Sequence, residues 1–382
     1  MYEEVISFIR QLYNTDELLP LHEPRFWGNE KKYLNDAIDS TFVSSAGAYV
    51  DRFEEDFANY IGVSKSVACV NGTAALHTAL ILADVYQNDE VITQPLTFVA
   101  TCNAISYQKA HSVFIDVDKD TMGMSPKSLS IFLEEHAKIT ENGCLNKTTG
   151  RIIKAVVPMH TFGHACRIGE IATICQKWQI TLIEDAAECL GSTHKGQPLG
   201  TFGDISAFSF NGNKIITTGG GGMVVAKDAA LLQRAKHLTT TSRVLHPYEF
   251  NHDEIGYNYR MPNLNAALGC AQIEQMEMYM ASKRTLANNY HKFFKDKKET
   301  FVVEPPESNS NYWLNAIILN NKSDKVSFIK ATNSKGIMVR PIWTLMNKLP
   351  MFKNCQTGPL ENAEWLEDRV VNIPSSVIKY KP

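Results

Sequence analysis

The stretch Ser206–Val225, SAFSFNGNKIITTGGGGMVV, decides how the rest of the chain is interpreted. A short apolar run leads into a polar turn that carries Lys214, and four glycines, Gly219–Gly222, precede a second apolar run. A partly desolvated lysine at a strand end can form a Schiff base with a carbonyl group. Glycines accept positive φ and let the backbone approach a ligand closely. Taken alone, however, the segment fits a solvated lysine and a simple strand connection better than a catalytic site.

Two other stretches change that interpretation. Asn71-Gly72-Thr73 follows an apolar run and opens the helical run Ala74–Tyr86, so its free N–H groups and the helix dipole favour a phosphate. ITLIED, Ile180–Asp185, is typical of a buried strand that ends in carboxylates, and parallel sheets bind ligands at the carboxyl ends of their strands. With Lys214, these are the parts needed to hold pyridoxal 5′-phosphate, Asp185 keeping the ring nitrogen protonated.

Strand and helix patterns alternate between about residues 66 and 225, which predicts a mostly parallel sheet covered by helices on both faces. The expected strands are Ser66–Val70, Glu90–Gln94, Ser112–Asp116, Ile152–Pro158, Thr181–Glu184, Ile205–Phe210 and Met223–Ala226. Further helices are expected at about Tyr2–Tyr13, Glu30–Asp39, Tyr49–Tyr60 and Asn263–Lys292. Lys138–Gly150 is polar and contains Asn142-Gly143, so we predict a surface loop there. Runs at Phe301–Val303, Trp313–Leu319 and Gly336–Arg340 indicate a small α/β domain.

The composition is that of an ordinary soluble enzyme, with 382 residues, 44% hydrophobic residues and a net charge of −3. This charge balance gives no reason to expect nucleic acid or an anionic membrane as a partner. No apolar run is long enough to span a membrane, and the N-terminus MYEEVISFIR lacks the pattern of a signal peptide, so a cytoplasmic location is expected. The eight cysteines include no CxxC pair, which favours reduced thiols over disulfides or a metal site.

An ordered set of motifs between about Leu19 and Cys270 resembles the DegT/DnrJ/EryC1/StrS family of sugar aminotransferases. The matching runs are FVSSAGAYVDRFEEDFANYIGV, VNGTAALHTAL, PLTFVATCNAI, PMHTFGH, EDAAECLGS, FSFNGNK, TGGGGMV and GYNYRMPNLNAALG. The resemblance implies the aspartate aminotransferase-like fold (type I) of enzymes that depend on pyridoxal phosphate. It implies a large cofactor-binding domain with a seven-stranded sheet (19–270) and a small C-terminal α/β domain (271–382). The helical pattern ahead of the resemblance predicts an N-terminal helical extension (1–18) that docks on the body of the protein or on a partner subunit.

The resemblance also implies roles for individual residues. Lys214 and Asp185 are expected to be catalytic. Those expected to bind the cofactor are Gly72, Thr73 and Ser209 at the phosphate, Phe98 stacked on the ring, Asp185 at the ring nitrogen, Glu188 near the ring hydroxyl, Lys214, and Asn258 reaching in from a neighbouring subunit. Those expected near the substrate are His160, Arg260, Arg340 and Trp343. The plainer alternatives are a core role for Phe98 and Trp343, a structural role for His160, and turn roles for Ser209 and Asn258.

By the same resemblance, the expected reaction moves an amino group from L-glutamate to C4 of a UDP- or other nucleotide-linked 4-keto-6-deoxy-N-acetylhexosamine, for amino sugars of surface polysaccharides. Pyridoxamine phosphate is the intermediate form of the cofactor, and the active unit is a homodimer with shared sites. The alternatives are a 3-keto-sugar aminotransferase and a regulator that binds the cofactor without turnover. Relatives that dehydrate the sugar carry histidine at the lysine position, and Lys214 argues against that chemistry.

Overall fold

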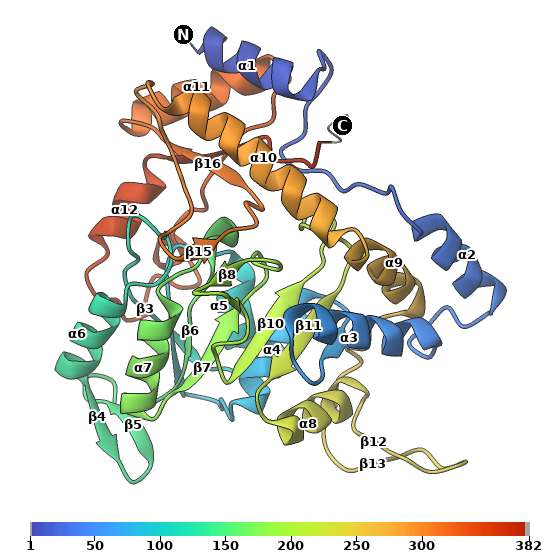
Figure 1. Cartoon of the computed structure of the whole chain (residues 1–382). Coiled ribbons are helices and arrows are strands. Elements are labelled where there is room, and N and C mark those ends of the chain that lie inside the picture. Colours follow the sequence, from blue (N-terminus) through green and yellow to red (C-terminus); the bar gives the residue numbers. More distant parts are fainter. Residues whose placement is uncertain (1, 379–382) are drawn as a thin grey trace.

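The large central sheet determines the architecture of the protein, whose computed structural model describes residues 2–378 (Figure 1). Seven of its nine strands follow the order β1-β11-β10-β7-β6-β2-β3. Their bounds are β1 Val67–Cys69, β11 Gly222–Ala226, β10 Ile205–Ser209, β7 Thr181–Asp185, β6 Ile152–Val157, β2 Glu90–Thr93 and β3 His111–Phe114. All seven predicted strands are confirmed, with ends within two residues of the prediction. Only β11 runs antiparallel to its neighbours in this path.

Two apolar cores cover the two faces of this sheet, because successive strand residues point to opposite sides. Val156 and Val157, adjacent in β6, belong to different cores. One core includes helices α3 (Ala48–Ile61), α6 (Pro126–His136), α7 (Ile168–Trp178) and α9 (Asn263–Ile273). The other includes α4 (Gly72–Leu82), α5 (Val99–Tyr107) and α8 (Ala229–Thr239). The expected fold class, an α/β transferase of fold type I, is confirmed by this layered arrangement together with the structural relatives described below.

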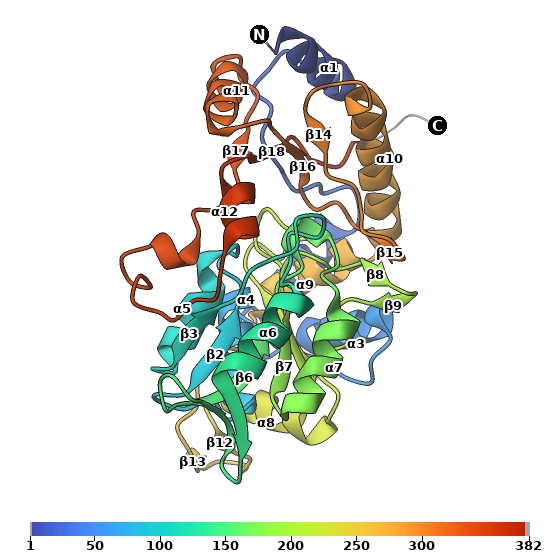
Figure 2. The same cartoon turned by 90° about the vertical axis from the view of Figure 1, so that its left-hand side faces the viewer.

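A smaller sheet lies above the large one in Figure 2 and has the order β14-β16-β18-β17. Its strands are β14 Thr300–Phe301, β16 Asn315–Ile318, β18 Val370–Ile373 and β17 Arg340–Pro341, and its helices are α10 Met276–Phe294, α11 Lys322–Ser334 and α12 Glu361–Glu367. Helix α1 (Glu3–Tyr13) packs Val5, Ile6 and Ile9 into the same core as Tyr290 and Phe328. The predicted N-terminal helix therefore docks on the small domain. The proposed domain limits, 1–18, 19–270 and 271–382, remain predictions, and residues 1 and 379–382 lie outside the described chain.

Two sequence expectations are corrected. The predicted loop at Lys138–Gly150 contains a hairpin, β4 (Ala137–Thr140) and β5 (Gly143–Asn146), which joins the large sheet through β6. Glu141 and Asn142 form its turn, and Gly143, the first residue of β5, has φ 114°. The predicted helix Asn263–Lys292 is two helices, α9 and α10, separated at Glu274 and Gln275. The Glu274 carboxylate at this break accepts hydrogen bonds from Tyr33, Arg52 and Asn29.

Short elements complete the described chain. They are α2 Glu30–Asp39, the strands β8 Thr193–His194, β9 Gln197–Pro198 and β15 Ser308–Asn309, the hairpin β12 Arg243–Val244 with β13 Asn251–His252, and the 3₁₀ turns η1 Thr161–Gly163 and η2 Met346–Lys348. The β12–β13 hairpin projects from the body of the molecule (Figure 1). Among residues 2–378, no helix combines the length and the apolar character that a membrane crossing requires.

Candidate active site

A cavity of about 320 Å³ lies at the carboxyl ends of the central strands and also contacts the small domain. Its wall consists of Asn71, Gly72, Thr73, Leu76, Phe98, Ala100, Thr101, Met159, Asp185, Ala187, Glu188, Ser209, Asn211, Asn213, Lys214, Trp313 and Trp343. Parallel strands bring the loops after their carboxyl ends to one edge of the sheet, which explains how residues so distant in sequence meet here. Eight of the twelve predicted site residues line this cavity.

One end of the cavity is formed by the first turn of α4. The cap residue Asn71 is extended, and its Oδ1 accepts a hydrogen bond of 2.8 Å from the Ala74 N–H. The preceding N–H groups, those of Gly72 and Thr73, have no acceptor within the helix because they belong to its first turn. A Cβ atom on Gly72 would lie 2.7 Å from Cβ and 2.9 Å from Oγ of Ser209. The helix N-terminus and the Ser209 hydroxyl therefore converge closely enough to hold one phosphate between them.

Asp185 ends β7 and is 2% exposed. Its Oδ2 accepts a hydrogen bond of 2.7 Å from the Thr101 hydroxyl, and its Oδ1 accepts one of 3.2 Å from the Ala187 N–H. Burial raises the pKa of Asp185, and these two donors oppose that shift. A cation or a cationic N–H group in the cavity would stabilise the carboxylate further, since buried charges need a partner.

Lys214 and Glu188 form an ion pair inside the cavity. The Nζ atom of Lys214 lies 3.3 Å from Glu188 Oε1, and the lysine side chain is 13% exposed. The other carboxylate oxygen of Glu188 accepts a hydrogen bond of 2.9 Å from the Phe162 N–H. Burial raises the pKa of Glu188 to about 7, although Lys214 and the Phe162 N–H act in the opposite direction. The amine thus lies beside a group that can exchange a proton near neutral pH.

The glycine run after Lys214 has two different structural roles. Gly219 has φ 80°, which suits a turn. Gly222 lies in β11, where a Cβ atom would approach the backbone oxygen of Asn71 to 2.5 Å. The small side chain of glycine therefore lets β11 lie against the segment that begins α4.

A sequence model of the "DegT/DnrJ/EryC1/StrS aminotransferase family" matches residues 26–378. The chain belongs to this family. It is 38% identical over 365 residues to GDP-perosamine synthase of Escherichia coli O157:H7, covering 94% of this chain and 93% of that protein. It is also 38% identical over 335 residues to a putative pyridoxal phosphate-dependent aminotransferase, EpsN, of Bacillus subtilis (strain 168), covering 87% of this chain and 83% of EpsN.

Solved structures support the same fold. Helicobacter pylori PseC, an aminotransferase involved in the biosynthesis of pseudoaminic acid, superposes with a TM-score of 0.85 over 94% of both chains at 23% identity. The sequence-based expectation of a DegT/DnrJ/EryC1/StrS aminotransferase is therefore confirmed.

Pyridoxal 5′-phosphate is the cofactor of this aminotransferase, and the residues present fit it. The anion site at α4 suits its phosphate, and the place that a Cβ atom of Gly72 would fill is kept free beside Ser209. The buried carboxylate of Asp185 suits a protonated ring nitrogen. Lys214 provides a primary amine in the same cavity. Phe98, 52% exposed at the start of α5, contributes an aromatic face to the wall.

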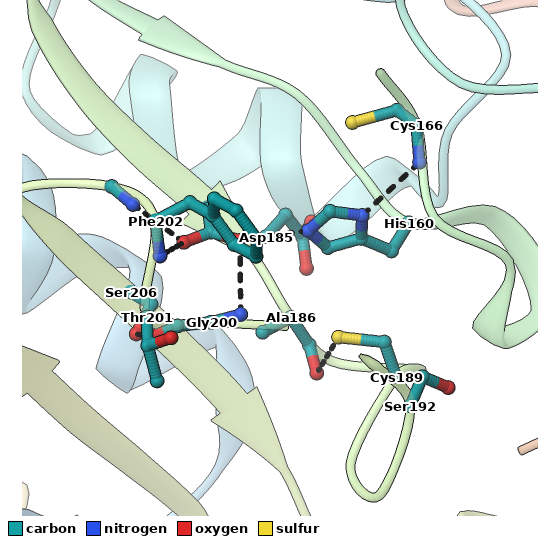
Figure 3. A network of polar contacts seen from close by, with 12 residues as sticks. His160, Cys166, Asp185, Ala186, Cys189, Ser192, Gly200, Thr201, Phe202 and Ser206 are labelled. Atoms are coloured by element: carbon teal, nitrogen blue, oxygen red, sulfur yellow. Dashed lines mark hydrogen bonds and ion pairs between the residues drawn. The ribbon is translucent and has the colours of Figure 1, made fainter. Parts of the chain in front are cut away.

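His160, expected near the substrate, does not belong to the cavity wall among residues 2–378. It is fully buried, and its Nε2 lies 2.9 Å from Glu184 Oε2 while its Nδ1 accepts a hydrogen bond from the Cys166 N–H (Figure 3). Glu184 precedes Asp185 in β7 and therefore points to the opposite face of the sheet. The same carboxylate accepts hydrogen bonds from the N–H groups of Gly200, Phe202 and Gly203. His160 belongs to this buried network behind the strand that carries Asp185.

Three other predicted residues lie outside the cavity of the single chain. Asn258 and Arg260 are exposed, and Arg260 borders a separate hollow with Lys236. Arg340 is exposed on β17, where it donates a hydrogen bond of 3.1 Å to Asn333 Oδ1. Trp343, in contrast, lines the cavity and packs against Phe162 with ring centroids 5.1 Å apart.

Sequence reasoning missed Thr101 and Trp313. Thr101 lies three residues after Phe98 in the motif PLTFVATCNAI, about one helical turn further along α5. This spacing places both side chains on the same side of the helix and could have identified Thr101 as a site residue. Trp313 lies 99 residues after Lys214, and no local pattern connects the two. Only the packing of the small domain against the cavity brings this indole to the lysine.

Proposed function

We propose that this aminotransferase moves the amino group of L-glutamate to the keto carbon, C4, of a nucleotide-linked deoxysugar. The observation that carries the proposal is the arrangement of Lys214, Asp185 and the α4 anion site around one cavity. When bound, pyridoxal phosphate supplies an electrophilic carbon and a ring that accepts the electron pair released at the amino-bearing carbon.

The chain's own residues would divide the remaining work. Gly72, Thr73 and Ser209 bind the phosphate and fix the position of the ring. Asp185 holds the proton on the ring nitrogen, which its buried carboxylate favours by charge. The Nζ atom of Lys214 would move a proton between the amino-bearing carbon and the electrophilic carbon named above. Glu188, 3.3 Å from this Nζ atom, helps to set the charge of the lysine amine.

The nucleotide is proposed from the relatives. The 38% identity to a GDP-perosamine synthase over nearly the full length supports a GDP-linked sugar. A UDP-linked 4-keto-6-deoxy-N-acetylhexosamine, expected from the overall resemblance of the sequence, is the second candidate. Both belong to the biosynthesis of amino sugars for surface polysaccharides.

We further propose that the active unit is a homodimer with shared active sites. Asn258 is exposed and lies outside the cavity of its own chain, as a residue that serves a neighbour would. The segment from the β12–β13 hairpin to Asn258 also exposes large apolar side chains, including Leu245 at 96% and Ile255 at 84%. Exposed apolar side chains of this size favour contact with another protein surface.

The test combines purified protein, pyridoxal phosphate and L-glutamate with GDP- and UDP-linked sugars that carry a keto group at C4 or C3. We expect 2-oxoglutarate and an aminated 4-keto substrate, identified by mass and NMR. The Lys214→Ala variant, which lacks the reacting amine, should be inactive with every substrate. Amination of only the 3-keto sugars would overturn the C4 assignment. Bound cofactor without reaction with glutamate would indicate a regulator instead.

A further inference from the structure

The amine of the catalytic lysine lies against the ring of Trp313. The Nζ atom of Lys214 lies 3.8 Å from the centroid of the Trp313 ring. This ring is 4% exposed and therefore shielded from water. Glu188 contacts the same amine at 3.3 Å. The amine is thus in contact with two different groups, one that can take its proton and one that attracts the ammonium without taking a proton.

The indole is also tied to the backbone that carries the lysine. Its Nε1–H donates a hydrogen bond of 2.6 Å to the carbonyl oxygen of Asn213, the residue immediately before Lys214. One side chain therefore contacts both the lysine amine and the backbone carbonyl group just before the lysine. A change in the position of Trp313 would move the turn and the Nζ atom together.

Two polar side chains hold the backbone of Trp313 in place. Its N–H donates a hydrogen bond of 2.7 Å to Asn311 Oδ1, and its carbonyl oxygen accepts one of 2.7 Å from Lys283 Nζ. Lys283 is completely buried in α10 and donates a second hydrogen bond to the Ser375 carbonyl oxygen. Two fixed bonds at one residue leave little freedom for its backbone.

Asn311 links Trp313 to Glu188. Its Nδ2 donates hydrogen bonds of 2.9 Å to the carbonyl oxygens of Glu188 and Leu190. The contact requires a glycine opposite it, because a Cβ atom at Gly163, where φ is 95°, would lie 1.8 Å from Asn311 Oδ1. The two groups that contact the Lys214 amine are therefore joined through one buried amide.

We propose that Trp313 is a positioning residue for the Lys214 amine, holding it on the indole face while it is not bonded to the cofactor. Nothing in this role depends on which sugar is aminated. It does depend on the aminotransferase chemistry of Lys214, so the test uses the cofactor and glutamate only. Failure of the sugar assignment and failure of this inference are then separate results.

The experiment compares Trp313→Leu, which removes the ring, with Trp313→Phe, which keeps an aromatic face but loses the N–H donor. Trp365→Leu serves as a matched control, because Trp365 belongs to α12 and its ring lies near Lys119 and Arg369. Cofactor-free protein is mixed with pyridoxal 5′-phosphate, quenched with borohydride at set times and digested. Mass spectrometry then gives the rate at which Lys214 is labelled.

We expect Trp313→Leu to slow labelling of Lys214 about tenfold, the scale of one buried contact between a cation and an aromatic face. The rate of its reaction with glutamate should fall similarly, with KM for glutamate within about twofold of wild type. Trp313→Phe should stay within about threefold in both rates while its Tm falls, because the Asn213 carbonyl loses its donor. Trp365→Leu should match wild type in both rates.

If a folded Trp313→Leu variant labels Lys214 at the wild-type rate, the proposal is overturned. Equal losses in the Leu and Phe variants would also overturn it, since the ring face would then not be the cause. If the Leu variant does not fold, the Phe variant decides. Labelling within threefold of wild type supports the role of the ring, and a tenfold loss refutes it.

Discussion

Two carboxylates, those of Asp185 and Glu188, line the candidate active-site cavity, and their surroundings differ. Asp185 accepts hydrogen bonds from Thr101 and from the Ala187 N–H, both of which favour its charged form. Glu188 has one backbone donor and the Lys214 amine, and burial raises its pKa to about 7. Burial raises the pKa of both carboxyl groups, but at Asp185 two donors oppose that shift and a cationic N–H group of the ring would stabilise the charge further. Asp185 is therefore suited to be charged when the cofactor is bound, whereas Glu188 is suited to gain or lose a proton during turnover.

Glu188 should make the stability of the cofactor-free protein depend on pH. Its ordinary pKa of 4.5 is raised to about 7 in the folded state. Below about pH 4.5 both the folded and the unfolded state hold the proton. Between pH 4.5 and about 7 only the folded state holds it, so the free energy of unfolding falls as pH rises. Relative to Glu188→Gln, the wild type should lose about 3 kcal/mol across this range.

Denaturant unfolding of both proteins at intervals from pH 4.5 to 8 measures this difference. Glu307→Gln is the control, because the Glu307 side chain is 66% exposed and forms an ion pair with the exposed side chain of Lys195. Its curve should run parallel to that of the wild type. Parallel curves for Glu188→Gln and wild type would contradict a raised pKa at Glu188.

At the scale of residues, the sequence predicted those parts of the site that follow a strand directly. Asp185 ends a buried apolar run and Ser209 ends another, so their place at the sheet edge follows from the pattern. The indole of Trp313 could not be predicted in this way, because its contact with Lys214 depends on how two domains pack. His160 also follows a strand, but the first turn of the chain after β6 directs its ring away from the cavity toward Glu184.

At the scale of elements, the N-terminus of α4 combines a local signal with a tertiary contact. Asn71 caps the N-terminus of the helix, and an asparagine in this place is a local signal that can be recognised in the sequence. The need for glycine at position 72 is not local, because it arises from Ser209, 137 residues later in the chain. The anion site therefore requires the start of α4 to pack closely against the end of β10.

Gly72→Ala should weaken binding of pyridoxal phosphate. The added Cβ atom would lie 2.7 Å from Ser209 Cβ, so the helix start or the serine must shift. An overpacked contact of this kind corresponds to a roughly tenfold rise in the Kd of the cofactor. Titration of cofactor-free protein with pyridoxal phosphate, followed by absorbance, measures the change.

A second glycine provides the matched control for this titration. Gly169 lies in the first turn of α7, and a Cβ atom there meets nothing within 4 Å. Gly169→Ala should bind the cofactor as the wild type does. An unchanged Kd for Gly72→Ala would mean that the phosphate does not sit between α4 and Ser209.

Elements that were mispredicted share one cause, which is pairing with distant parts of the chain. The β4–β5 hairpin is polar in sequence, yet Cys144 and Asn146 are buried where it joins β6. The break between α9 and α10, at Glu274 and Gln275, contains no proline or glycine that would predict it from the sequence. It coincides with side-chain bonds from α2 and α3 to Glu274, which a helical periodicity cannot reveal.

At the scale of the whole molecule, both domains contribute to the cavity, but one chain does not bring every predicted residue to it. Trp313 and Trp343 come from beyond the last strand of the large sheet. Asn258 remains exposed outside the cavity, next to the backbone of Thr240. If Asn258 completes the phosphate site of a second chain, two-fold symmetry gives two equivalent sites at one interface.

A shared site predicts that two inactive variants restore each other's activity. In a hybrid of Lys214→Ala and Asn258→Ala subunits, one site carries both defects and the other carries neither. With equal amounts and random exchange, half of the dimers are hybrids and each has one intact site. The mixture should therefore recover about one quarter of wild-type activity.

Mixing Lys214→Ala with Asp185→Asn provides the control that makes this test specific. Both residues line the cavity of the same chain, so every site in that hybrid carries one of the two defects. No activity should return, although native mass spectrometry should reveal the same extent of subunit exchange. Recovery in both mixtures would point to a cause other than a shared site. Exchange without recovery in the Asn258 mixture, or full activity of a monomer, would leave Asn258 as a turn residue only.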